Sequence, residues 1–413
     1  MKTISMVIIK PTKSCNADCS YCCAPSDGAP KWTDEDFRRA FDMLEQRLHP
    51  AATFLWHGGE PMLLGPRFYR KAYDYARNRL SGVRFSMQSN MLSYSDRWKA
   101  VFREVFKGGI STSWDPDGQC RSIKGSPELY SRVFQAKMES LLNDGWHPNV
   151  IATFTDSTIH LARDTYGKAL ESSKNGRPYD IRLNYRYPAG RALNAGPAIR
   201  PDTYGRYLTE IYDRWIVDCP DFLVTPLDQM LMKVAGAETG RCPWSKSCTG
   251  RIIEIEPNFD VYNCGEFADV GNAEFRFGNL LKDGIGACLS SRAANGLAQR
   301  RYRHPKECMQ CIHFDECEGG CMRDSVLFGG GLYGKFHYCE SWKEIFSRIK
   351  ESILTGEADR TLERLGLNSK CVVHTVRSKL SKGINSGLKN MRREIETSGF
   401  APGRDNAMSA MAV

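Results

Sequence analysis

The placement of cysteines constrains this chain more than any other feature of its sequence. Its 413 residues include 16 cysteines, gathered mainly near the N-terminus and beyond residue 240. The N-terminus runs from Met1 through Lys2 and Thr3 directly into an apolar segment, without the pattern of a secretion signal. We therefore expect a cytoplasmic protein, whose thiols a reducing compartment keeps free. Metal or cluster ligation then becomes the leading role for the cysteines, ahead of a disulfide scaffold.

Composition and charge exclude some classes of protein. With 41% hydrophobic and 25% charged residues the chain reads as soluble and globular. Its longest apolar runs, such as Met6 to Ile9, have the length of a strand, so we expect no membrane-spanning segment. The net charge of +9 is concentrated late, from Arg360 to Arg393. This stretch lacks interleaved aromatic residues, which favours a solvated basic helix over a nucleic-acid partner.

Alternating strand-like and helical segments predict βα units in the first half of the chain. Thr33 and three acidic residues after it predict the start of a helix over Thr33 to Leu48. Six such units would form a partial barrel of the α/β class. We expect the barrel to span 1–225, a cysteine-rich unit 226–342, and a helical segment with a basic flexible tail 343–413. The expected strands are Ile4 to Ile9, Thr53 to Trp56, Val83 to Gln88, Gly109 to Ser113, Val150 to Phe154 and Asp180 to Tyr185.

Soon after the first expected strand, Cys15, Cys19 and Cys22 form a CxxxCxxC spacing. Three thiolates on one short loop can hold three corners of a 4Fe-4S cluster and leave one iron open to another ligand. S-adenosylmethionine (SAM) can chelate that iron through its amino and carboxylate groups. The alternative is a zinc loop completed by a distant residue, although zinc sites usually contain paired CxxC knuckles.

This spacing, with the aromatic Tyr21 before the last cysteine, resembles the signature of the radical SAM superfamily. The segment from Trp56 to Pro61 resembles the GGEP motif of that family. The resemblance implies a partial (β/α)6 TIM-like barrel whose strand ends contact SAM. Arg121 and Arg191 are weaker candidates for binding the SAM carboxylate, since surface arginines are far commoner than ligating ones. Ordinary capping of strand ends is the alternative for each polar residue. The implied SAM contacts are Tyr21, Gly58, Gly59, Glu60, Gln88, Asn90, Ser113 and Asp115.

The second cysteine region contains the spacing CxxCxxxxxCxxxC, and eight of its cysteines suffice for two four-thiolate sites. A zinc ribbon is the alternative. The region resembles the SPASM extension of radical SAM peptide and protein maturases, such as the anaerobic sulfatase-maturing enzymes. That resemblance implies two auxiliary 4Fe-4S clusters, an inner one held by Cys242, Cys248, Cys264 and Cys321 and an outer one held by Cys308, Cys311, Cys317 and Cys339.

Two departures from the family pattern affect the expected function. Phe259 stands where the family has a turn glycine, and we expect the preceding Asn258 to adopt the unusual backbone angle. Sulfatase-maturing enzymes place a catalytic aspartate directly after the third inner ligand, and here that position is Gly265. Sulfatase maturation is therefore disfavoured, and the adjacent Glu266 is a candidate base.

The resemblance implies an enzyme with SAM and three 4Fe-4S clusters that generates a 5'-deoxyadenosyl radical. Its expected activity is oxidative modification of a ribosomal peptide or protein side chain, by a crosslink, a thioether or dehydrogenation. An oxidoreductase acting on a small molecule in cofactor or natural-product biosynthesis is the alternative. A non-enzymatic zinc or iron-sulfur interaction module is a third reading. Expected partners are the peptide or protein substrate and an electron donor such as flavodoxin or ferredoxin, with no membrane and no nucleic acid.

Overall fold

The structure is a computed structural model that describes residues 3–23, 30–194, 198–237, 248–269 and 273–380. Eight parallel strands form a curved, open sheet in the order β10-β1-β3-β4-β5-β7-β8-β9, and the antiparallel strands β11 and β12 extend it beyond β10. A separate pair, β2 and β6, lies outside this sheet. The strands are β1 (Ile4–Ile9), β2 (Asp18–Cys19), β3 (Leu48–Trp56), β4 (Arg84–Gln88), β5 (Ile110–Trp114), β6 (Arg121–Ser122), β7 (Asn149–Phe154), β8 (Asp180–Tyr185), β9 (Val224–Thr225), β10 (Ile252–Ile255), β11 (Asp260–Tyr262) and β12 (Gly278–Asn279).

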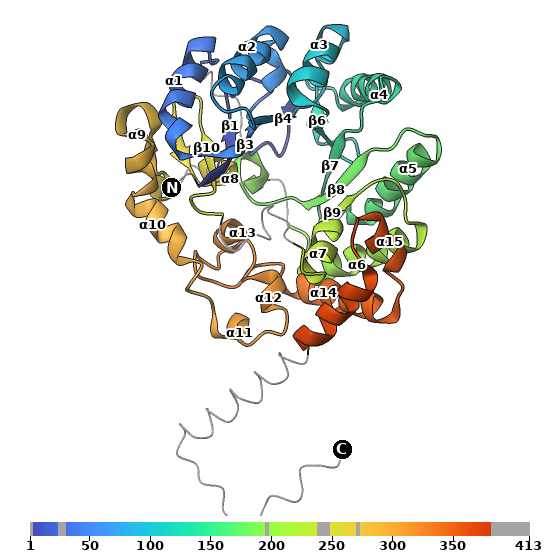
Figure 1. The fold of residues 1–413 in the computed structure, drawn as a ribbon. Coiled ribbons are helices and arrows are strands. Elements are labelled where there is room, and N and C mark those ends of the chain that lie inside the picture. The colour runs from blue at the N-terminus through green and yellow to red at the C-terminus, as the bar shows by residue number, and fades with distance from the viewer. Residues whose placement is uncertain (1–2, 24–29, 195–197, 238–247, 270–272, 381–413) are drawn as a thin grey trace, which may run out of the picture.

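The six expected strands correspond to β1, β3, β4, β5, β7 and β8, which lie side by side in chain order. The predicted partial α/β barrel is therefore confirmed. Helices α1 to α5 follow an arc outside the strands, and α11 to α13 lie on another side of the molecule (Figure 1). The first helices are α1 (Asp34–Leu44), α2 (Pro66–Arg77), α3 (Asp96–Val101), α4 (Pro127–Asn143), α5 (Ala162–Lys174), α6 (Pro201–Asp218), α7 (Leu227–Val234) and α8 (Gly265–Asp269). The later ones are α9 (Leu280–Leu289), α10 (Arg292–Gln299), α11 (Lys306–Met309), α12 (Phe314–Cys317), α13 (Met322–Leu327), α14 (Cys339–Thr355) and α15 (Asp359–Arg364).

Helix α1 begins as the sequence predicts but ends four residues earlier. The Thr33 hydroxyl accepts a hydrogen bond from the Asp36 backbone N–H, and the Asp36 carboxylate accepts one from Thr33 N–H, which forms a capping box. The helix stops at Leu44 instead of Leu48, and Leu48 already belongs to β3. Between Leu44 and Leu48 the chain tightens into one 3-10 turn, Glu45–Arg47.

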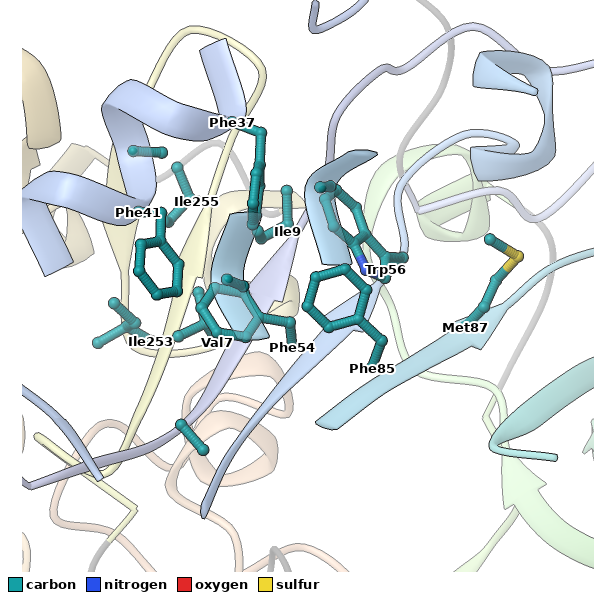
Figure 2. Packing of buried hydrophobic residues seen from close by; sticks show 14 of the residues in the cluster. Val7, Ile9, Phe37, Phe41, Phe54, Trp56, Phe85, Met87, Ile253 and Ile255 are labelled. Carbon is teal, nitrogen blue, oxygen red and sulfur yellow. The ribbon is translucent and has the colours of Figure 1, made fainter. Parts of the chain in front are cut away.

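Apolar side chains at alternate strand positions lie on one face of the sheet and pack against helix α1. Phe37 of α1 packs against Trp56 with ring centroids 5.5 Å apart, and Phe41 packs against Phe54 at 5.8 Å. Figure 2 shows these rings over the side chains of the neighbouring strands, which point to the same side because strand residues alternate between faces. The strand residues in this view are Val7, Ile9, Phe54, Trp56, Phe85, Met87, Ile253 and Ile255.

Strand β10 comes from the cysteine-rich region and pairs with the first strand of the barrel. Ile253 lies opposite Val7, and Ile255 lies opposite Ile9, in a parallel register. The segment Ile252–Ile255 has three isoleucines and Glu254, which is typical of a short strand but does not predict this partner. The pairing ties the second cysteine region to the barrel through backbone hydrogen bonds and the shared core.

The turn before β11 corrects one expectation. Phe259 itself has a left-handed backbone angle, with φ of 67°, whereas Asn258 does not. The Asn258 side chain instead accepts a hydrogen bond from the Asp260 backbone N–H at 3.1 Å, as in an Asx turn. The Phe259 ring stacks on Trp32 at 4.9 Å. A positive φ is unfavourable for a bulky residue. We attribute its presence at Phe259 to the stacking on Trp32.

Within the described residues, every helix is too short or too polar to cross a membrane.

Candidate functional site

The first cysteine loop lies at the C-terminal end of β1, where active sites of parallel barrels form. Strand β2 within this loop pairs with β6, which places Cys19 opposite Arg121. Burial raises the thiol pKa of Cys19 to about 12, and the charges of Cys22 and Cys15 add to this rise. The Cys15 and Cys22 thiols therefore lie close enough to Cys19 for their charges to affect its ionisation.

Gly58 and Gly59 allow the backbone that leads into the cysteine loop to lie directly on the end of β3. A Cβ atom at Gly58 would stand 2.6 Å from the carbonyl oxygen of Thr12, and one at Gly59 would stand 2.3 Å from that of Ser14. Gly58 also has a φ of +114°, which favours glycine. The family resemblance implies a role for both glycines in SAM binding, but close packing of two backbone segments already requires them.

We expect the substitution Gly59→Ala to destabilise the protein by about 3 kcal/mol, because the new methyl group meets backbone atoms that cannot rotate away. Gly167→Ala is the matched control: this glycine lies inside α5, and a Cβ atom added to it would have nothing within 4 Å. The control should stabilise the protein by about 0.5–1 kcal/mol. Urea unfolding measures both changes, and equal stabilities for the two variants would contradict the role of backbone packing.

Glu60 is buried and joins the segment after β3 to the end of β4. Its Oε1 atom accepts hydrogen bonds from Met62 N–H at 2.7 Å and from the Ser89 hydroxyl at 2.8 Å. Its Oε2 atom accepts one from Asn90 N–H at 2.8 Å. Burial raises the pKa of Glu60 to about 7, against the lowering effect of these donors. The carboxyl group thus has a structural role, while its contact with SAM stays a prediction.

The polar residues at the ends of β4 and β5 face the cysteine loop. The Asn90 side-chain amide lies 3.7 Å from the Cys15 sulfur. The Gln88 amide donates to the Ser113 hydroxyl at 3.4 Å. These contacts bring four of the predicted residues to one edge of the sheet, and their binding of SAM stays a prediction.

Tyr21, Asp115 and Arg121 form a buried hydrogen-bonded group beside the loop. The Tyr21 hydroxyl donates to Asp115, and Arg121 donates to that hydroxyl at 2.7 Å. Arg121 also lies 3.1 Å from Asp115 and 3.9 Å from the Cys19 sulfur. Burial raises the pKa of Asp115, whereas Arg121 and Tyr21 lower it. Arg121 therefore orients two of the predicted SAM contacts and places a cation next to a loop thiol.

The four cysteines assigned to the outer cluster line one partly open pocket. Lys335, Lys343 and Glu307 lie on its wall, together with apolar rings. Four thiols thus line the same pocket, and this donor set fits a fully ligated 4Fe-4S cluster. These cysteines are Cys308, Cys311, Cys317 and Cys339.

Three of the four cysteines assigned to the inner cluster also lie near one another. Burial raises the thiol pKa of Cys264, and the charges of Cys321 and Cys248 contribute to the rise. The Asn263 amide lies 3.3 Å from the Cys248 sulfur. Cys242 lies outside the described residues. In the described part of the chain, no three His, Cys, Asp or Glu side chains surround a single metal ion; in a four-iron cluster each thiolate binds its own iron.

Glu266 is held by Arg323 between the barrel and the auxiliary region. The Arg323 guanidinium lies 2.9 Å from the Glu266 carboxylate and 2.6 Å from Asp324, and it stacks over the Tyr187 ring at 4.3 Å. Burial would raise the pKa of Glu266, but Arg323 outweighs it and lowers that pKa to about 2. Asp324 in turn accepts a hydrogen bond from Tyr185 at the end of β8. The candidate base is thus a partly exposed carboxylate that Arg323 of α13 holds, and the Tyr187 hydroxyl donates to it at 3.4 Å.

Lys10 anchors the turn that carries Glu266. Its buried ammonium group lies 2.6 Å from Asp269, 3.0 Å from Glu256 and 3.3 Å from Glu254, and donates to the Gly265 carbonyl at 3.1 Å. Burial lowers the pKa of Lys10, but the three carboxylates outweigh this effect and raise it well above the ordinary value. The lysine therefore links the end of β1 to both β10 and α8.

Sequence reasoning missed Lys10 and Arg323. A lysine directly after the apolar strand β1 was a visible signal for the first, since a charge there has to find partners. Arg323 carries no such signal, because its partner Glu266 lies far away along the chain and only the fold brings them together.

Several known proteins resemble this chain over most of its length. No protein-family model matches the sequence. The serine-type anaerobic sulfatase-maturating enzyme of Bacteroides thetaiotaomicron is 24% identical over 378 residues, covering 83% of this chain and 89% of the relative. The cysteine-type enzyme of Clostridium novyi is 23% identical over 374 residues, covering 84% and 96%. The mycofactocin maturase MftC of Mycolicibacterium smegmatis is 26% identical over 348 residues, covering 80% and 81%. The chain is a homologue of the radical SAM maturases.

Solved structures of radical SAM maturases share the fold of this homologue. Native anSMEcpe with bound AdoMet superimposes with a TM-score of 0.70 at 18% identity, covering 85% of this chain and 99% of the other. Streptococcus suis SuiB bound to its precursor peptide SuiA gives a TM-score of 0.59 at 12% identity, covering 82% and 76%. The radical SAM and SPASM resemblance seen in the sequence is therefore confirmed.

Proposed function

We propose that this radical SAM maturase uses SAM and three 4Fe-4S clusters to oxidise a side chain of a ribosomal peptide or a protein. The observation that carries the proposal is the placement of three thiols at the C-terminal edge of a parallel barrel, surrounded by polar strand ends. The four-thiol cavity in the auxiliary region supports the second half of the proposal. SuiB, of similar fold, is bound to a precursor peptide, which supports a peptide as the substrate class.

A 4Fe-4S cluster held by Cys15, Cys19 and Cys22 would supply the electron that cleaves SAM to methionine and the 5'-deoxyadenosyl radical. The protein itself positions the cluster ligands and the substrate relative to one another. Cys15, Cys19 and Cys22 supply three thiolates, and Arg121 fixes Tyr21 and Asp115 beside them. These contacts hold the Tyr21 and Asp115 side chains in place beside the cysteine loop.

Glu266 is the group we assign to accept the substrate proton. Loss of a hydrogen atom leaves a substrate radical, and further loss of one proton and one electron completes a two-electron oxidation. The ion pair with Arg323 holds Glu266 as a carboxylate beside the inner cysteines. Auxiliary clusters held by the inner and outer cysteines would take up that electron. Sulfatase maturation is not proposed, because Gly265 stands where those enzymes have their aspartate.

Incubation of the anaerobic enzyme, SAM and reductant with short peptides encoded beside its gene should yield a peptide that has lost the mass of two hydrogen atoms. Mass spectrometry of the peptides measures this change, and Cys19→Ala serves as the inactive control. If the enzyme cleaves SAM but alters only small molecules and no peptide or protein, the substrate class proposed here is wrong.

A further inference from the structure

Strands β7 and β8 have a buried outer face and an accessible inner face. Side chains alternate between half-buried and buried along β7 and most of β8, since successive strand residues point to opposite faces. Ile181 and Leu183 of β8 pack in an apolar core with residues of α5 and α6. The residues of the other face keep partial contact with solvent, so this part of the barrel has an accessible interior. That inner face is mainly polar and carries Asn149 and Thr153 on β7 and Arg182 and Asn184 on β8.

Arg182 places a positive charge on this inner face. Its Nε atom donates to the neutral side-chain oxygen of Asn184 at 3.0 Å. Among the described residues, no carboxylate forms an ion pair with its guanidinium. The acidic residue on the same face of the strand, Asp180, instead contacts His147 at 3.0 Å and the Leu223 backbone N–H at 2.8 Å. The donors on Nη1 and Nη2 of Arg182 are therefore available to a ligand.

Other cations inside the protein have carboxylate partners. Lys10 has three carboxylate neighbours, and Arg121 and Arg323 each have at least one within 3.1 Å. Such pairing is expected, because removing a charge from water is costly unless an opposite charge compensates for it. By comparison, the guanidinium of Arg182 is half-buried with a neutral amide as its partner. An anionic group that arrives with a ligand would complete the same pattern at Arg182.

The register of the sheet places Arg182 close to the predicted SAM site. Ser113 of β5 pairs with Ile151 of β7, and Ile151 pairs with Arg182. Residues paired in this way point to the same face, and neighbouring strands lie about 4.8 Å apart. Arg182 therefore lies about 10 Å across the sheet from Ser113, one of the predicted SAM contacts. A substrate group held at Arg182 would place the neighbouring substrate residues near SAM.

We propose that Arg182 binds a carboxylate group of the peptide substrate and thereby positions the reacting residue beside SAM. The inference rests on the proposed function, because it needs a peptide substrate. A carboxylate is the anionic group of an unmodified ribosomal peptide, where aspartate, glutamate or the C-terminus carries it. The two Nη atoms can donate to both oxygens of such a group. The bond from Nε to Asn184 already orients the guanidinium, so less side-chain freedom is lost on binding.

The test uses the peptide, encoded beside the gene, that the enzyme oxidises, together with amide versions of it. In each version one aspartate or glutamate is replaced by asparagine or glutamine, or the C-terminus is amidated. With the wild-type enzyme, one version should raise the KM for peptide oxidation about 30-fold. That version shows whether the carboxylate belongs to a side chain or to the C-terminus. Arg182→Gln should raise the KM for the unaltered peptide by a similar factor.

Combining the two changes separates carboxylate binding from a structural role of Arg182. With Arg182→Gln, the peptide and its amide version should have the same KM, because the partner of the carboxylate is gone. Arg182→Lys keeps the charge and should recover part of the loss. Arg84→Gln is the matched control: this arginine is exposed at the start of β4, and its replacement should leave KM unchanged. The dissociation constant of SAM should be the same in every variant.

Equal KM values for all amide versions with the wild-type enzyme would overturn the inference, and this comparison does not depend on the folding of any variant. So would an Arg182→Gln enzyme that still discriminates between the two peptides. Weaker SAM binding by Arg182→Gln with an unchanged peptide KM would place the residue in the SAM site instead. Wild-type protein that cleaves SAM but oxidises no peptide would refute the proposed function itself. Peptide oxidation that is insensitive to every amide replacement would refute the carboxylate site alone.

Discussion

Replacing Cys19 by alanine should reduce the release of 5'-deoxyadenosine from SAM to background. The reason is geometric: the loop offers three thiolates for one cluster, and removing the middle one leaves two on a loop that β2 and β6 hold in place. Two thiolates hold only two corners of a cluster that needs three protein ligands. Chromatography of the anaerobic reaction with SAM and reductant measures the nucleoside.

Cys371→Ala is the matched control for this prediction. Cys371 is an exposed cysteine that belongs to none of the three proposed ligand sets. Its replacement should leave both SAM cleavage and iron content unchanged. If Cys19→Ala still cleaved SAM at the wild-type rate, the assignment of the first cluster would be refuted.

Replacing Cys311 by alanine should separate the two halves of the reaction. This residue lines the outer cavity and is remote in sequence from the first loop, so SAM cleavage should continue at a reduced or equal rate. Product should be lost, because the electron from the substrate radical no longer has its exit. Iron should fall by about four per chain.

The measurements for Cys311→Ala are nucleoside release, peptide mass and iron content on the same sample. Persistent SAM cleavage without peptide oxidation would show that the outer cluster acts after hydrogen abstraction. Unaltered yield of the oxidised peptide would contradict an electron-transfer role for that cluster.

Most of the barrel could be predicted from the sequence, because alternating apolar residues identify strands locally. Strand β8 matches its predicted bounds, Asp180 to Tyr185, and β1 matches Ile4 to Ile9. The end of α1 could not be predicted, because the last predicted turn is the 3-10 turn Glu45–Arg47 and a residue pattern does not separate the two helix types. The partner of β10 could not be predicted, since a four-residue segment with three isoleucines specifies a strand but not the strand beside it.

The candidate site could likewise be predicted from the sequence only in part. Cysteine spacing and the Gly58 and Gly59 pair are local signals, and the structure places both at one edge of the sheet. The contacts of Arg323 and Lys10 depend on segments that only the fold brings together. Phe259 shows the limit of a rule based on residue type, because its left-handed angle is combined with stacking on Trp32.

Metal analysis of the protein isolated without oxygen tests the central claim most directly. Three clusters predict about twelve irons per chain and little zinc, with the broad visible absorbance of cubane centres. Zinc with little iron would mean that the thiols form structural zinc sites instead, and it would contradict radical chemistry in this protein.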